Sequence, residues 1–144
     1  MFSKTCEYAL RALIYIAQKT QKGERLSIPE VASGIGSSEY FIAKILQQMA
    51  KKGFVSSAKG PSGGFFMEAE NRKTSLSEVI RFFDGDKIFS GCTLGLKECS
   101  ESTPCPLHND FVIIRQKIKE TLDGSSIDSL IEDLEMQRTF LKSK

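Results

Sequence analysis

The chain has 144 residues, of which 40% are apolar and 26% charged, and its formal net charge is +2. This length fits one domain, or one small domain with an appendage, and the composition is that of an ordinary soluble protein. The apolar runs fall far short of the roughly 20 residues of a membrane span, and Glu7 and Arg11 interrupt the stretch that a secretory leader would need. We therefore expect a cytoplasmic protein that does not enter a membrane.

Positive charge is concentrated in the N-terminal half. Residues 1–75 contain 11 Lys and Arg against 6 Asp and Glu, whereas residues 76–144 contain 9 against 12. Residues 40–67 contain no acidic side chain. The cations of this acid-free stretch are Lys44, Lys51, Lys52 and Lys59. Such a stretch suits the binding of phosphate groups, although a solvated lysine-rich face would have the same composition.

Apolar residues at helical spacing predict three helices in the first third of the chain. The first covers residues 3–20, where apolar positions recur with the 3.6-residue period. The second covers residues 27–33, with the serine at its start as the N-cap. Gly34-Ile35-Gly36 forms a tight turn, and the third helix covers residues 39–52 and ends at Gly53 in a left-handed conformation.

Two helices joined by a short glycine-containing turn are typical of a helix-turn-helix, although an ordinary helical hairpin would look the same. Residues 54–58 and 65–67 then predict two strands around the basic, glycine-rich turn 59–64, which is the pattern of a winged helix. We expect residues on the exposed face of helix 39–52 and on this turn to contact bases and phosphates. The candidate DNA-binding residues are Ser38, Glu39, Tyr40, Lys44, Gln47, Lys51, Lys59, Gly60, Ser62 and Gly63.

The second half predicts a helix, a loop and two further helices. Ser75 and Glu78 are spaced for a capping box at the start of a helix that ends near residue 84. A long helix follows over residues 106–122, and a last one ends near Leu141. The apolar stripe of the long helix is wide for so small a protein, so we expect it to pack against a second copy, with burial in its own core as the alternative. The members of this stripe are Phe111, Val112, Ile113, Ile114, Ile118 and Leu122.

These elements predict a mostly α protein with a small β-hairpin wing and a long dimerisation helix. Residues 1–84 form the winged helix-turn-helix domain that binds DNA. Residues 85–105 form a cysteine-rich loop, and residues 106–144 hold the dimerisation helix and the C-terminal helix. No nucleophile–base pair and no phosphate-binding loop between a strand and a helix is present in the sequence, so we do not expect an enzyme.

Four soft metal ligands, Cys92, Cys99, Cys105 and His108, fall within 17 residues. Thiolates and an imidazole bind zinc or iron–sulfur clusters. Because the spacing lacks the short paired knuckles of a zinc finger, it favours an iron–sulfur cluster. A structural zinc ion in a constitutive DNA-binding protein is the alternative.

Segments of the chain resemble the IscR/NsrR/CymR-type family of bacterial winged-helix transcription regulators. They are residues 8–13, 38–47, 53–55, 59–65 and 76–80, together with the three spaced cysteines, and the resemblance extends from residue 2 to about 130. It implies a homodimer joined by its long helices, palindromic operator DNA read by helix 39–52 in the major groove, and a cluster that controls repression. Redox state, nitric oxide and iron supply are the signals it implies.

The resemblance leaves the fourth cluster ligand open. His108 is similar to the histidine that completes a 2Fe–2S site in IscR-like members, although the gap between Cys92 and Cys99 is one residue longer than theirs. In NsrR-like members a carboxylate from the other subunit completes a 4Fe–4S site, and Glu7, with Cys6 beside it, falls about there. We favour 2Fe–2S over 4Fe–4S, with His108, Glu7 or Cys6 as fourth ligand, or none from the protein. Such a cluster can be lost during purification.

Overall fold

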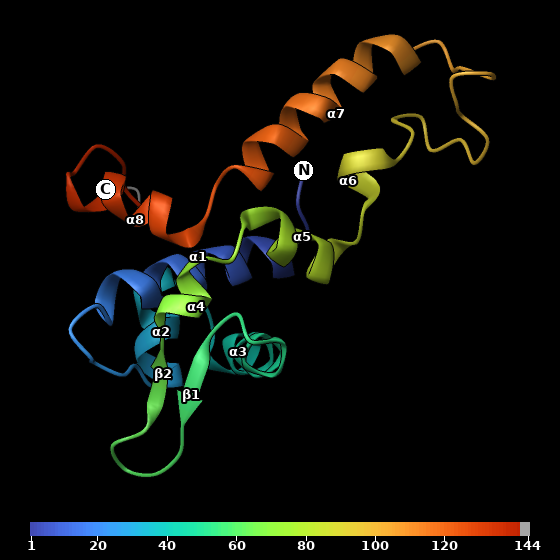
Figure 1. Cartoon of the computed structure of the whole chain (residues 1–144). Coiled ribbons are helices and arrows are strands. Elements are labelled where there is room, and N and C mark those ends of the chain that lie inside the picture. Colours follow the sequence, from blue (N-terminus) through green and yellow to red (C-terminus); the bar gives the residue numbers. More distant parts are fainter. Residues whose placement is uncertain (142–144) are drawn as a thin grey trace.

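A computed structural model describes residues 1–141 of the protein. The chain is mostly helical with one antiparallel hairpin, as predicted (Figure 1). The elements are α1 (Lys4–Lys19), α2 (Ile28–Ile35), α3 (Glu39–Lys52), β1 (Ser56–Ala58), β2 (Gly64–Phe66), α4 (Ala69–Arg72), α5 (Leu76–Asp84), α6 (Lys87–Ser90), α7 (His108–Asp123) and α8 (Ile127–Glu135).

Helix α1 is the centre of the core. Ser3 caps its N-terminus, and it packs against α2, α3, α5 and α8. Ala9 and Ala12 let these neighbours approach closely, while Leu13 and Ile16 are fully buried among them. Each such large aliphatic side chain contributes about 1.5–3 kcal/mol by leaving water. The rigid body that results holds α3 and the wing in place.

The helix-turn-helix is formed by α2 and α3. Ser27 and Ser38 are their N-caps, and Gly53 ends α3 with φ +87°, as predicted. The turn begins two residues later than predicted, because Gly34 and Ile35 still belong to α2. A Cβ on Gly34 would lie 2.2 Å from the Tyr15 ring, so this glycine serves the contact between α2 and α1.

The wing consists of β1 and β2, paired from Ser56–Phe66 to Ala58–Gly64. Strand β1 begins two residues later than predicted and is shorter, while β2 has the predicted length but begins and ends one residue earlier. Phe54, Val55 and Met67 leave the hairpin and pack into the core instead. The one-turn helix α4, which the sequence pattern does not predict, follows the wing.

Asn71 of α4 ties the wing to the end of α3. Its side chain is 7% exposed, and its amide donates to the Gly53 carbonyl at 2.8 Å. Its Oδ1 atom accepts from the Glu68 N–H at 2.7 Å and from the Ser56 hydroxyl at 2.9 Å. One side chain therefore fixes the end of α3, the first strand and α4 relative to one another.

Replacing Asn71 by alanine is expected to lower the free energy of unfolding by about 2–3 kcal/mol, because it leaves two partly buried backbone groups without their partners. Urea titration followed by circular dichroism measures the change. Asn109→Ala, at an exposed position on α7, is the control and should change stability by less than about 0.5 kcal/mol. A wild-type unfolding midpoint for Asn71→Ala would contradict the assignment.

The C-terminal third contains an extended arm, helix α7, followed by helix α8, which packs back on the core. The capping box of Ser75 and Glu78 starts α5, as predicted. The short helix α6 was not predicted, and α7 begins at His108 and extends away from the body (Figure 1). Helix α8 then packs back on α1. It ends at Glu135 and not near Leu141, because the chain reverses at Gln137, whose φ is +57°. Residues 142–144 of the predicted 106–144 segment lie outside the described residues.

Candidate DNA interface and cysteine site

The outer face of α3 is polar and exposed, while its inner face carries the buried Ile42, Ile45, Leu46 and Met49. Tyr40 is 76% exposed, and the ammonium of Lys44 lies 5.0 Å from the centre of its ring. All ten predicted DNA-binding residues are exposed except Gly63, which is partly exposed. The hydroxyl of Ser38 accepts from the Phe41 N–H, which leaves its proton and a second lone pair for another partner.

A hollow of about 450 Å³ separates α3 from the wing. Its walls include the predicted Lys44, Gln47 and Lys51, together with residues that the sequence analysis did not select. The additional lining residues are Gln48, Ala50, Ser57 and Phe65. Gln48 follows Lys44 by four residues and precedes Lys51 by three, a helical spacing that could have indicated it. Ser57 and Phe65 reach the hollow only because the hairpin folds against α3.

Two glycines of the wing are required by close backbone contacts in and beside the hairpin. A Cβ on Gly63 would lie 2.2 Å from the Ala58 carbonyl oxygen. A Cβ on Gly64, whose φ is +142°, would lie 2.7 Å from the Leu26 carbonyl oxygen. Because both clashes are with backbone, a side chain at either position would force the wing to move. The glycines therefore set the shape of the wing before any DNA is bound.

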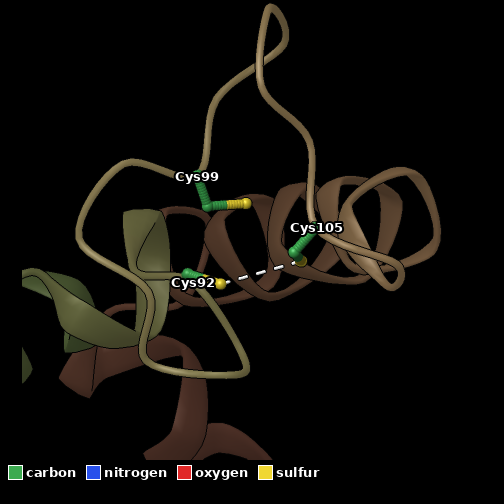
Figure 2. Close-up of side chains that lie close together, drawn as sticks. All are labelled: Cys92, Cys99 and Cys105. Atoms are coloured by element: carbon green, nitrogen blue, oxygen red, sulfur yellow. Dashed lines mark hydrogen bonds between the residues drawn. The ribbon is translucent and has the colours of Figure 1, made fainter.

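The three cysteines of the loop between α6 and α7 converge. Their Sγ atoms all lie within 4.8 Å of one another, and Figure 2 shows the side chains gathered beside α7. The thiol of Cys92 donates to the sulfur of Cys105 at 3.7 Å. All four cysteines of the chain, Cys6 included, are free in residues 1–141. Residues spread over 14 positions of a loop with little secondary structure thus present three thiols to one point.

His108 borders this thiol group. It is the first residue of α7 and is 8% exposed, and its Nδ1 atom lies 3.1 Å from the sulfur of Cys99. Its Nε2 atom is buried and has no hydrogen-bond partner among the described residues. An unpaired buried polar atom is costly. Three soft thiols with an imidazole that has a spare nitrogen fit a metal centre.

The other candidate ligands lie on α1. Cys6 is fully buried inside its own chain, and burial, with Asp84 and Glu7 adding to the effect, raises the pKa of its thiol from 9.0 to about 12. The side chain of Glu7 is 39% exposed and forms an ion pair with Lys4 at 3.3 Å. Neither belongs to the thiol group of its own chain. The accessible carboxylate of Glu7 is thus better placed than Cys6 to reach a second subunit.

In iron-free folded protein, Cys92 is expected to react with iodoacetamide at least ~100-fold faster than Cys6 at pH 7.5. Backbone N–H groups lower the pKa of the Cys92 thiol from 9.0 to about 7, that of Leu96 contributing most and that of Leu94 less. Cys92 is then mostly thiolate at pH 7.5, and its rate should fall as the pH drops through 7. Mass spectrometry of peptides measures both rates, and urea-unfolded protein is the control in which the two thiols react alike. Equal rates in the folded protein would contradict the prediction.

A family profile described as Rrf2, an iron-dependent transcriptional regulator, matches residues 2–133. The chain belongs to the Rrf2 family. IscR of Aliivibrio salmonicida is 26% identical to this Rrf2 regulator over 131 residues, which are 91% of this chain and 77% of that protein. NsrR of Geobacillus kaustophilus is 24% identical over 139 residues, 96% of this chain and 94% of that one.

The solved structure of CymR, the global cysteine regulator of B. subtilis, has the same fold. Its TM-score is 0.76 at 21% identity, over 92% of this chain and 96% of that chain. The predicted family and the predicted fold are therefore confirmed. This Rrf2 protein is a DNA-binding transcriptional regulator, and its named relatives are regulators and not enzymes. Within residues 1–141, no helix combines the length and the apolar character that crossing a bilayer requires.

Proposed function

We propose that this Rrf2 regulator is a homodimeric repressor of the cytoplasm whose affinity for its operator is set by an iron–sulfur cluster. Cys92, Cys99 and Cys105 would hold the cluster. The observation that carries the proposal is the convergence of these three thiols within 4.8 Å in a family described as iron-dependent. A bound cluster would supply redox chemistry and reactivity toward oxidants and nitric oxide.

Helix α7 supports the dimer. Of its 16 residues, all of them described, only His108 is buried. Phe111, Ile114 and Ile118 line a groove of about 650 Å³, whose lining also includes Met1 and Ile88. An apolar stripe left open along an extended arm suits the same stripe of a second copy. Ile113, which the sequence analysis assigned to the stripe, is 72% exposed and lies instead on a polar side of the helix.

The exposed face of α3 and the wing support operator binding. We infer that α3 enters the major groove, where Tyr40 and Gln47 contact base edges. Lys44, Lys51 and Lys59 would contact phosphates on either side of the hollow between α3 and the wing. Two such units in a dimer would bind two half-sites of a palindrome.

Contacts at the base of the arm offer a route from the cluster to the DNA-binding body. Ser77 of α5 donates to Asp123, the last residue of α7, at 2.5 Å. Arg81 of α5 binds Asp86, just before α6, at 2.8 Å and lies 3.8 Å from Asp123. The segment just before the cysteine loop and the C-terminal end of α7 are therefore both tied to α5. Losing the cluster would free the loop and change how α7, and with it the second subunit, sits on the body.

The fourth ligand distinguishes two forms of the proposal. His108 touches the thiol group within one chain and supports a 2Fe–2S cluster, which we favour. The partly exposed Glu7, reaching across from the other subunit, would support a 4Fe–4S cluster. If His108 is the ligand, His108→Ala should change the visible absorption and resonance Raman spectra, while Glu7→Ala should leave them unchanged.

A structural zinc ion is the second candidate. The 3.7 Å between the sulfurs of Cys92 and Cys105 is close to the roughly 3.8 Å that separates two thiolates on one tetrahedral ion with Zn–S bonds of about 2.3 Å. A cluster would need the thiols to spread over more than one iron. Metal analysis separates the two candidates directly.

The experiment compares cluster-loaded and metal-free protein. Protein is prepared without air, its iron, sulfide and zinc are measured, and an operator is selected from random-sequence DNA. Iron with equimolar sulfide, and an operator affinity that differs at least tenfold between the two forms, is the expected result. Zinc without iron would favour the second candidate, and equal affinities across a salt titration would refute the switch.

Replacing Lys51 or Lys59 by glutamine is expected to weaken operator binding and to lower the slope of log K against log salt by about 1 for each lysine. Each lysine that is removed leaves one DNA phosphate that no longer releases its counterions when the protein binds. Filter binding or fluorescence anisotropy at several salt concentrations measures the slope. Lys117→Gln, on the exposed side of α7 and far from the wing (Figure 1), is the control and should leave the slope unchanged.

A further inference from the structure

The wing is attached to a segment outside the hairpin. The backbone N–H of Leu26 donates to the Phe65 carbonyl at 2.9 Å, and the N–H of Phe65 donates to the Leu26 carbonyl at 2.7 Å. These two bonds form a bridge between the connection that precedes α2 and strand β2. The wing is therefore supported on the side of β2 by a single bridging residue of this connection.

Arg25, the residue before this bridge, contacts both the base and the tip of the wing. The Cζ atom of its guanidinium lies 5.0 Å from the centre of the Phe66 ring, next to the bridge. Its Nη1 atom donates to the Ser62 carbonyl in the tip at 3.4 Å. Arg25 is exposed and carries a positive charge, and the sequence analysis did not select it.

The tip has few other restraints. Gly63 N–H donates to the Gly60 carbonyl at 2.9 Å, and Gly60 has φ +96°. Glycines lose much conformational freedom when they are ordered. A tip that is already ordered in the free protein loses less of that freedom on binding, which strengthens binding without any new contact to DNA.

We propose that Arg25 is a positioning residue that holds the wing tip, residues 59–63, in its DNA-binding conformation. The inference rests on the proposed DNA interface. A planar guanidinium stacks on an aromatic ring and keeps a donor in a fixed direction, which the flexible ammonium of lysine does not do. Charge alone is therefore insufficient at this position, in contrast to a residue whose role is to neutralise a phosphate.

The test compares Arg25→Lys and Arg25→Met with the wild type. Both variants should bind the selected operator roughly 5- to 30-fold more weakly, because both lose the stacked hydrogen-bonded guanidinium. The slope of log K against log salt should stay at the wild-type value in both. Lys22→Met removes one exposed charge from the same connection and is the matched control, with less than about twofold change.

A measurement on the free protein separates this inference from the proposed function. Backbone ¹⁵N relaxation of residues 59–63 should show greater motion in both Arg25 variants than in the wild type and in Lys22→Met. Wild-type affinity for Arg25→Lys would overturn the proposal, as would a slope lowered by about 1 in Arg25→Met, which identifies a phosphate contact. Should the wild type bind no DNA while the relaxation changes appear as expected, the proposed DNA interface fails but the restraint of the tip stands.

Discussion

Replacing Ile114 by glutamate is expected to convert the proposed dimer into monomers and to weaken operator binding by roughly 10²- to 10⁴-fold. Ile114 is 45% exposed on the arm and lines the apolar groove of α7 with Phe111 and Ile118. A carboxylate in an interface between two such stripes would lose its hydration without gaining a partner. Operator affinity would then fall because the two half-sites are no longer bound by linked subunits, and linkage is worth about this factor.

Gln116→Glu is the matched control for this substitution. It adds the same charge to the same helix, about 160° around the axis from Ile114, where Gln116 is exposed and donates to Glu120 at 2.9 Å. Sedimentation equilibrium measures the mass, and a titration with operator DNA measures the affinity. A monomeric wild type, or a dimeric Ile114→Glu variant with wild-type affinity, would refute dimerisation through this face of α7.

Replacing Cys105 by serine is expected to lower the affinity for the proposed metal centre by at least ~100-fold and to make operator binding independent of iron. Changes in groups that merely support a metal ligand already cost ~10- to 100-fold in affinity, and a serine hydroxyl is a far weaker ligand for iron than a thiolate. Because Cys105 lies three residues before His108, the serine variant also tests whether the start of α7 depends on the centre. Its operator affinity should equal that of metal-free wild-type protein.

Cys6→Ala is the control that removes a thiol outside the group. Because Cys6 is buried in its own chain, the variant should keep its iron and its response. Iron and sulfide content, visible absorption and operator affinity are measured for both variants. Full iron content in Cys105→Ser would contradict the proposed site, and loss of iron in Cys6→Ala would instead identify Cys6 as the fourth ligand.

Local patterns in the sequence determined most of the helices. Ser27, Ser38 and Ser75 each cap a helix by accepting from an N–H three residues along the chain, so the pattern and the contact are both local. The predicted bounds of α3 match because its apolar stripe, its cap and Gly53 all agree. The one-turn helices α4 and α6 are too short to show a period, and their prediction failed for that reason.

The candidate site was also predictable from the sequence only in part. The sequence indicated the candidate metal ligands, because Cys92, Cys99 and Cys105 are unusual residues at close spacing. It also indicated the exposed face of α3 and the basic turn of the wing. It did not indicate that the thiols meet within 4.8 Å, since a loop of this composition can take many shapes.

Contacts between distant segments were decided by the tertiary structure alone. Arg25 meets Ser62, 37 residues away, and Asn71 meets Gly53, 18 residues away. Gly34 is needed because the Tyr15 ring packs on it, and β1 begins late because Phe54 and Val55 are drawn into the core. Periodicity and capping depend on neighbours within one helical turn, so they determine which segments fold into helices. Which side chains then support the wing and the cysteine site depends on how those segments pack, and no local pattern in the chain encodes that.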